Sequence, residues 1–192
     1  MNRCGVILAG GHSTRMGTNK ALLPLHNRTV IEHIADEMKS ISDEIVINSN
    51  DASLFSYLGL PIVEDRYKDQ GPLAGIEAIL SQVDSDVFLI SACDTPFVNQ
   101  QVYLYLLEQL EGFDAVIPIH KEKMHPLSGV YCRNIVNKLQ SQLDSGERKV
   151  KLLFEHIHVK YVDEFPGIPY KELEKHFFNM NNPVQYEEAK RL

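Results

Sequence analysis

The chain has 192 residues and lacks several features that mark other classes of protein. It has no glycine- and serine-rich linker, low-complexity stretch or internal repeat, so we expect a single domain over residues 1–192. No apolar run approaches the roughly 20 residues that a membrane helix needs, and no segment is typical of a secretory signal. We therefore expect a cytoplasmic protein with no membrane partner.

Cysteine is scarce, and positive charge is not in excess. Cys4, Cys93 and Cys132 are odd in number and widely separated, which disfavours a disulfide framework or a zinc knuckle and suits a reducing cytosol. The formal net charge of -7 argues against nucleic-acid binding, which depends on clustered lysine and arginine. With 44% hydrophobic residues, the chain can bury a substantial core.

Short apolar runs alternate with segments of helical spacing through the first two-thirds of the chain. The runs cover residues 5–9, 44–48, 86–91 and 114–118, and the helical segments cover residues 30–38 and 73–83. Uniformly apolar strands that alternate with helices are typical of a parallel sheet covered on both faces. The pattern predicts a doubly wound, mostly parallel sheet in a three-layer α/β/α arrangement.

The last third is less regular. It predicts helices at 134–143, 149–156 and 184–192, and residues 128–131 and 159–162 could add strands to the sheet. In open α/β sheets, ligands bind beyond the carboxyl ends of the strands. The residues just after each apolar run are therefore the candidates for a site.

A glycine-rich segment follows the first apolar run. Gly10 and Gly11 have no Cβ atom, so their backbone could approach a phosphate closely. Arg15 and Lys20 then supply cations suited to phosphate oxygens. A glycine pair can also serve only a tight turn, but the two cations favour phosphate binding. The spacing matches neither the Walker pattern nor the dinucleotide-binding fingerprint.

Asp94 follows the apolar run at 86–91 and is the candidate metal ligand. Mg2+ prefers oxygen ligands and is usually held by one or two carboxylates together with substrate phosphates. An N-cap or an Asx turn is the alternative role for Asp94.

Polar residues also follow other apolar runs. Asp65 could accept hydrogen bonds from a base or a ribose, Gly71 permits close backbone approach at a helix start, and Asn48 offers an amide. Each could also be an ordinary turn or surface residue. Downstream, His125, Arg148 and Asn181 are the candidates for binding a second substrate.

In their order along the chain, these segments resemble the molybdenum cofactor guanylyltransferases, the MobA-type nucleotidyltransferases, over nearly the whole length. The matching segments are 8–11, 15–17 with Lys20, Asn48, 64–65, 71–75, 93–96, 125–126, 146–148 and 179–183. Each is weakly specific alone, but the ordered set is strongly specific.

The resemblance implies a Rossmann-like nucleotidyltransferase fold and transfer of GMP from GTP to molybdenum-molybdopterin, with Mg2+ as cofactor. The expected GTP-binding residues are Leu8, Ala9, Gly10, Gly11, Lys20, Asn48, Asp65, Gly71 and Asp94. The expected catalytic residues are Arg15, Lys20 and Asp94, with Asp94 also binding the metal. Enzymes that insert or receive the cofactor would be transient partners.

Two other functions remain open from the residues themselves. A cytidylyltransferase acting on the same pterin, or on a sugar or polyol phosphate, would share the glycine-rich segment and its cations. A GTP-binding module without catalysis, acting in cofactor delivery, is the second. Lys20 and Asp94 argue against that module, because a sensor has no leaving group to stabilise.

Overall fold

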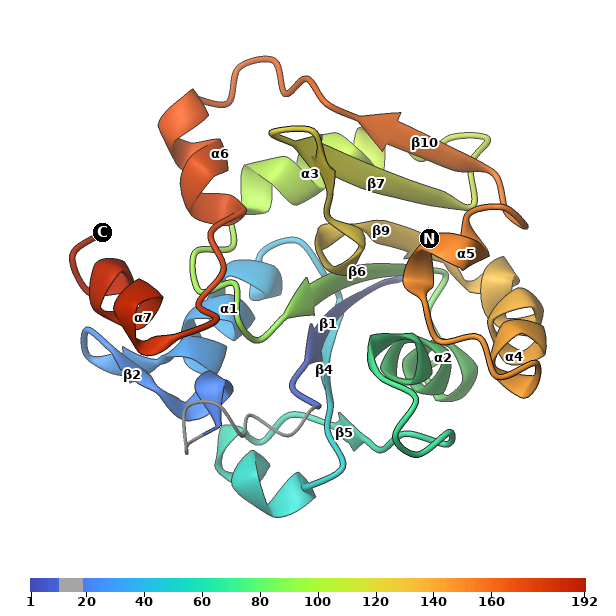
Figure 1. Ribbon diagram of the computed structural model, residues 1–192, viewed down its shortest axis with the longest axis horizontal. Coiled ribbons are helices and arrows are strands. Elements are labelled where there is room, and N and C mark those ends of the chain that lie inside the picture. Colours follow the sequence, from blue (N-terminus) through green and yellow to red (C-terminus); the bar gives the residue numbers. More distant parts are fainter. Residues whose placement is uncertain (11–18) are drawn as a thin grey trace.

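The computed structural model describes residues 1–10 and 19–192. Over these residues, eight strands form one sheet with the order β10-β7-β9-β6-β1-β4-β5, and β8 pairs with β7 (Figure 1). Its strands are β1 (Arg3–Leu8), β4 (Glu44–Asn48), β5 (Ile62–Val63), β6 (Val87–Ala92), β7 (Ala115–His120), β8 (Lys123–Met124), β9 (Val130–Cys132) and β10 (Val159–Val162). A separate hairpin joins β2 (Pro24–Leu25) to β3 (Arg28–Thr29).

Most neighbouring strands run parallel, as the sequence predicts. β1 lies between β4 and β6 and is parallel to both, and β5 and β10 are also added in parallel. The exceptions are β9, which runs antiparallel to both β6 and β7, and β8, which runs antiparallel to β7. Between β7 and β8 the chain turns sharply at Lys121 and Glu122, both of which have positive φ. The connection is too short for a parallel crossover, so the chain returns in the opposite direction.

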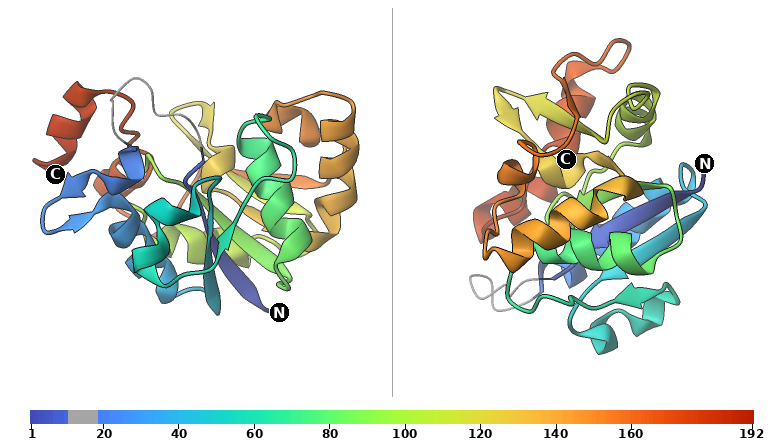
Figure 2. Two further views of the ribbon diagram at one scale, coloured as in Figure 1. Left: turned by 90° about the horizontal axis from the view of Figure 1, so that it is seen from below. Right: turned by 90° about the vertical axis from the view of Figure 1, so that its right-hand side faces the viewer.

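Helices cover both faces of the sheet (Figure 2). They are α1 (Val30–Lys39), α2 (Pro72–Gln82), α3 (Gln100–Glu108), α4 (Val136–Asp144), α5 (Val150–Leu153), α6 (Tyr170–His176) and α7 (Pro183–Ala189). The side chains of β1 and β4 alternate between two hydrophobic clusters: Ile7 and Ile47 belong to the cluster of α1 and α3, whereas Val6 and Val46 belong to that of α2 and α4. This alternation builds the three layers.

The helix boundaries follow local signals. Thr29 and Glu32 form a capping box at the start of α1. Gly71, with a φ of 71°, precedes Pro72 at the first position of α2. The helix predicted at 149–156 is shorter, because after Leu153 the chain continues in turns with hydrogen bonds to the third preceding residue. Helices α3 and α6 were not predicted from the sequence.

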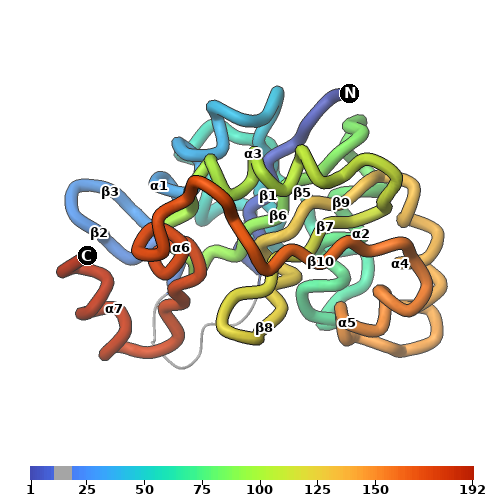
Figure 3. The backbone as a smooth tube through the Cα atoms, turned by 90° about the horizontal axis from the view of Figure 1, so that it is seen from above, coloured from blue at the N-terminus to red at the C-terminus, as the bar shows by residue number. Residues whose placement is uncertain are grey.

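The C-terminal segment returns to the carboxyl edge of the sheet. The Met180 backbone N–H donates to the Asp94 carbonyl over 2.8 Å, and the Tyr186 hydroxyl donates to the Pro24 carbonyl. In Figure 3, α7, the β7–β8 turn, the segment before α2 and the α4–α5 connection all lie along one edge of the molecule, the lower edge of that view. Among the helices of the described residues, none combines the length and the apolar character needed to cross a membrane.

Candidate active site

The central strands β4, β1 and β6 end at the same level. Leu8 at the end of β1 is in register with Asn48 in β4 and with Ala92 in β6. Past this row, the Ala9 N–H donates to the Asn48 carbonyl over 2.9 Å, and the Cys93 N–H donates to the Leu8 carbonyl over 3.1 Å. The segments that carry Gly10, Asn48 and Asp94 therefore leave the sheet beside one another. Leu8 and Ala9 are buried in the core. Their side chains therefore pack beneath the strand ends and support this edge of the sheet.

Asn48 and Asp65 meet at the β4 side of this edge. The Asn48 amide nitrogen donates to Asp65 Oδ1 over 2.8 Å and to the Val63 carbonyl over 3.2 Å. Asn50 contacts Asp65 twice, through its amide nitrogen to Oδ2 at 2.8 Å and through its Oδ1 from the Asp65 N–H at 3.0 Å. The Asp65 carboxylate is thus held by two amides before any ligand binds. A fixed carboxylate is an acceptor for the N–H groups of a base or the hydroxyls of a ribose.

Helix α2 contacts this network at Gly75. A Cβ atom on Gly75 would lie 2.3 Å from Asn48 Oδ1, so only glycine lets the helix approach the amide this closely. At Gly10 the corresponding distance to Asn48 Oδ1 is 3.5 Å, an ordinary contact. No contact among the described residues requires a glycine at position 10, which is consistent with a role toward a ligand.

Lys20 and Asp94 lie on the other side of the strand ends. Their charged groups are 4.0 Å apart, and their side chains are 16% and 28% exposed. Lys20 Nζ also donates to Asn181 Oδ1 over 3.2 Å. Asp94 is in turn tied through its carbonyl to Met180. Residues from the N-terminal, central and C-terminal parts of the chain therefore form one cation–carboxylate–amide cluster, the Lys20 cluster.

Burial raises the pKa of Asp94, while the nearby Lys20 ammonium opposes the shift. A divalent cation beside Asp94 would favour the ionised carboxylate in the same way as Lys20. The described residues contain no group of three or more histidine, cysteine, aspartate or glutamate side chains that could hold a metal ion. A single carboxylate nevertheless fits Mg2+, which commonly takes its other ligands from substrate phosphates and water.

The remaining candidates are distributed as follows. Gly11 and Arg15 lie outside the described residues. Gly71 has positive φ and is the N-cap residue directly before α2. His125 follows β8 and packs against Phe177, with ring centroids 4.5 Å apart. Arg148 is exposed in the α4–α5 connection. Of the three acceptor candidates, Asn181 alone forms a hydrogen bond with Lys20 within residues 1–10 and 19–192.

Sequence reasoning did not single out Asn50 or Glu77. Asn50 lies in a short polar stretch after β4, where its type gives no sign that it binds Asp65. Glu77 had a signal, because it is an acidic residue inside the otherwise apolar helix predicted at 73–83. It is completely buried in α2 and pairs with Arg66.

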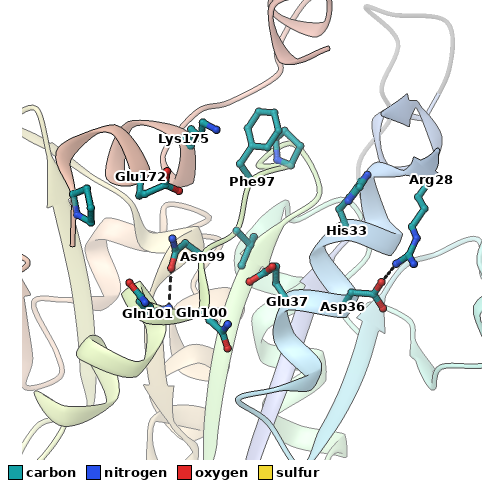
Figure 4. A pocket seen from close by; sticks show the side chains of 13 residues that line it. Arg28, His33, Asp36, Glu37, Phe97, Asn99, Gln100, Gln101, Glu172 and Lys175 are labelled. Carbon is teal, nitrogen blue, oxygen red and sulfur yellow. Dashed lines mark hydrogen bonds and ion pairs between the residues drawn. The ribbon is translucent and has the colours of Figure 1, made fainter. Parts of the chain in front are cut away.

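A cavity of about 750 Å³ lies away from these residues, between α1, the segment 96–101 and α6 (Figure 4). Charged and polar side chains of both signs line it, with Arg28, Asp36 and Glu37 on one side and Asn99 and Glu172 across from them. Its lining contains none of the predicted site residues. The candidate site is therefore defined by the strand ends and not by this cavity.

A mostly parallel sheet between two helical layers, with a lysine and a carboxylate facing each other beside its strand ends, defines the class of the α/β nucleotidyltransferases. A family model described as "MobA-like NTP transferase domain" matches residues 5–160. The chain belongs to this family.

Similar proteins cover nearly the whole chain. A Carboxydothermus hydrogenoformans protein, described as "Probable molybdenum cofactor guanylyltransferase", is 34% identical over 97% of this chain and 94% of its own. A Clostridium perfringens (strain 13) protein of the same description is 35% identical, with 98% and 96% covered.

Solved structures share the fold. The molybdopterin-guanine dinucleotide biosynthesis protein A of Archaeoglobus fulgidus has a TM-score of 0.83 at 25% identity, covering 98% of this chain and 97% of its own. A CMP:2-keto-3-deoxy-manno-octonic acid synthetase complexed with CTP has a TM-score of 0.76 at 14% identity, covering 100% and 98%. At that identity the likeness concerns the fold alone.

Proposed function

We propose that this chain transfers GMP from GTP to the terminal phosphate of molybdenum-molybdopterin, forming the guanine dinucleotide cofactor and releasing pyrophosphate. The observation that carries the proposal is the pairing of two groups at one sheet edge in a member of this family: the Asn48–Asp65 network and the Lys20 cluster. The first offers fixed polar groups to a base or ribose. The second offers a cation and a carboxylate to a triphosphate.

Asp94 would hold Mg2+, which supplies charge neutralisation for the triphosphate when bound. Lys20 would bind phosphate oxygens that become the pyrophosphate and stabilise the negative charge that develops there. Arg15, outside the described residues, would share this role. Phosphoryl-type transfer depends mainly on such positioning and electrostatic stabilisation, and the acceptor phosphate is already ionised near neutral pH. The proposed reaction therefore requires no general base from the protein.

The acceptor would bind on the side of Asn181. The hydrogen bond from Lys20 to Asn181 Oδ1 links the C-terminal segment to the phosphate side of the site. His125 and Arg148 belong to segments on the same edge of the sheet (Figure 3), and we propose them as further contacts to the acceptor. The proposed location in the cell is the cytoplasm, and the proposed unit is a single domain.

A cytidylyltransferase acting on the same pterin, or on a sugar or polyol phosphate, is the second candidate, because it would share the glycine-rich segment and its cations. Binding experiments separate the two. A ligand that binds only the folded state raises its stability according to ligand concentration and affinity. We expect GTP with Mg2+ to raise the Tm clearly more than CTP at the same concentration. A larger shift with CTP would exclude the guanine-specific assignment.

A further inference from the structure

Glu77 is a buried charged residue that the proposed reaction does not use. It lies on α2 among buried apolar residues, and its side chain is 0% exposed. Its Oε1 accepts hydrogen bonds from Arg66 Nη1 at 2.9 Å, Ser81 Oγ at 2.6 Å and Gln140 Nε2 at 2.9 Å. Burying a carboxylate is unfavourable unless it is paired, so its partners are essential to this helix.

Arg66 connects Glu77 to the candidate site. It directly follows Asp65, in the segment between β5 and α2. Asp65 is held by Asn48 and Asn50, and the Tyr67 hydroxyl donates to Asp144 Oδ1 over 2.9 Å. Three consecutive residues are thus fixed to three different parts of the fold: Asp65 to the end of β4, Arg66 to α2, and Tyr67 to α4.

The Arg66–Glu77 ion pair differs from the contacts of Asp65 and Tyr67 in the helix that it reaches. It joins the segment carrying Asp65 to the same helix that touches Asn48 through Gly75. Asp65 and Asn48 are therefore both held relative to α2, one through the ion pair and one through the close contact. A shift of Arg66 would change the direction of the Asp65 carboxylate while leaving Asn48 in place.

We infer that Arg66 and Glu77 are positioning residues that hold the Asp65 carboxylate in the orientation that recognises the nucleotide. This inference rests on the proposed function, in which Asp65 and Asn48 contact GTP. The pair contributes to GTP affinity through the preformed position of Asp65. It does not touch the phosphates, so it leaves the rate of the transfer step unchanged.

The test uses an apolar replacement of the whole pair, Arg66→Met with Glu77→Met. Removing Arg66 alone leaves the buried Glu77 carboxylate without its cation and is expected to destabilise the fold, whereas replacing both residues by methionine leaves no unpaired buried charge. We expect the double variant to stay folded, with its Tm lowered about as much as in the control variant Gln140→Met, because Glu77→Met also removes the acceptor of Gln140 and Ser81. We expect its KM for GTP to rise about tenfold at an unchanged kcat and an unchanged KM for the pterin.

Gln140→Met is the matched control. Gln140 donates to the same Glu77 oxygen but comes from α4, so its removal weakens the contact between two helices without freeing Arg66. We expect it to lower the Tm while leaving the KM for GTP unchanged. If the double variant keeps the parent's KM for GTP, or if Gln140→Met raises that KM as much as the double variant does, the positioning role is wrong.

Hydrogen exchange without nucleotide separates this inference from the proposed function. In the double variant, backbone amides at 64–70 should exchange faster than in the parent, while those of Gln140→Met should not. Unchanged exchange in the double variant overturns the positioning role by itself. If the parent protein does not turn over GTP, the proposed function fails and the inference fails with it, even where the double variant exchanges faster than the parent.

Discussion

The charged side chains at the strand ends are more buried than the charged side chains on the rest of the surface. Lys20 and Asp94 are largely buried, whereas the Arg133–Asp84 ion pair joins side chains that are 40% and 104% exposed. Exposed pairs contribute roughly 0–1 kcal/mol to stability and are screened by salt. Charges in a partly buried site act more strongly on a ligand, because less water screens them. Substitutions of the partly buried charges should therefore affect activity more than substitutions of the exposed charges.

Asp94→Asn should lower kcat by a factor of about 10² to 10³, because one electrostatic contact of this kind is worth roughly 3–4 kcal/mol in the transition state. Lys20→Ala should have an effect of similar size, since it removes the cation that we propose stabilises the leaving pyrophosphate. Pyrophosphate release measures both. Asp84→Asn is the control and should leave kcat unchanged. A near-normal rate in Asp94→Asn would remove Asp94 from the metal role.

The two glycines near Asn48 should respond differently to alanine. Gly75→Ala places a Cβ atom 2.3 Å from Asn48 Oδ1, so both stability and GTP affinity should fall, despite the better helix propensity of alanine. Gly10→Ala meets no close atom among the described residues. Its unfolding free energy should stay within about 0.5 kcal/mol of the parent, while GTP binding weakens. Denaturant unfolding and GTP titration check both, and full GTP affinity in Gly75→Ala would contradict the role given to Asn48.

At the scale of elements, the parallel strands could be predicted from the sequence and the C-terminal contacts could not. The runs at 44–48 and 159–162 are recognisable from the types of adjacent residues, and the structure confirms a strand at both. The hydrogen bond between Lys20 and Asn181 joins residues 161 positions apart. Local periodicity contains no information about such a contact. Asn181 was a candidate from the sequence, but no local pattern showed that the chain returns to the site there.

Helices α3 and α6 were not predicted, because their local sequence pattern is weak. Helix α3 carries a continuous run of apolar and aromatic residues at 102–107, of which only Val102, Tyr103 and Leu106 are buried. The run therefore lacks the alternation of apolar and polar residues that marks an amphipathic helix. Helix α6 has seven residues, of which Leu173 and His176 are buried. Its position comes from tertiary packing, since so short a helix has little stability of its own.

Substitutions of the neighbouring Asn181 and Asn182 should have different effects on turnover and stability. Asn181 contacts Lys20, whereas the Asn182 side chain caps α7 by accepting from the Gln185 N–H over 2.9 Å. Asn182→Ala should therefore cost about 1 kcal/mol of stability with little change in turnover. Asn181→Ala should lower turnover with little change in stability. Thermal unfolding and pyrophosphate release distinguish them, and the reverse pattern would contradict the assigned contacts.

At the scale of the whole molecule, the C-terminal helices close one face of the fold around a buried histidine. The His176 ring accepts a hydrogen bond from the Asn99 N–H and packs against Phe177 and Tyr103. Burial, together with the nearby His125 and His120, lowers the pKa of His176 from 6.5 to about 3. The folded protein therefore holds this ring neutral where the unfolded chain would protonate it.

The lowered pKa of His176 makes the stability of the folded protein decrease toward acidic pH. Above pH 6.5 the ring is neutral in both states and adds no slope. Between pH 6.5 and about 3 the unfolded state binds more protons, so stability falls as pH falls, by up to about 1.4 kcal/mol per pH unit. His176→Gln should be less stable than the parent at pH 7.5, and the difference should shrink toward pH 4.5. Parallel curves for the two proteins in denaturant unfolding would show that His176 does not carry this slope.

The central claim concerns which nucleotide the strand-end site uses and what receives it. Its most direct test is pyrophosphate release by the purified protein with Mg2+ and molybdenum-molybdopterin, with GTP and CTP compared at equal concentrations. The account predicts acceptor-dependent release with GTP, formation of the guanine dinucleotide, and much slower release with CTP. Faster release with CTP, or no acceptor-dependent release with GTP, would contradict it.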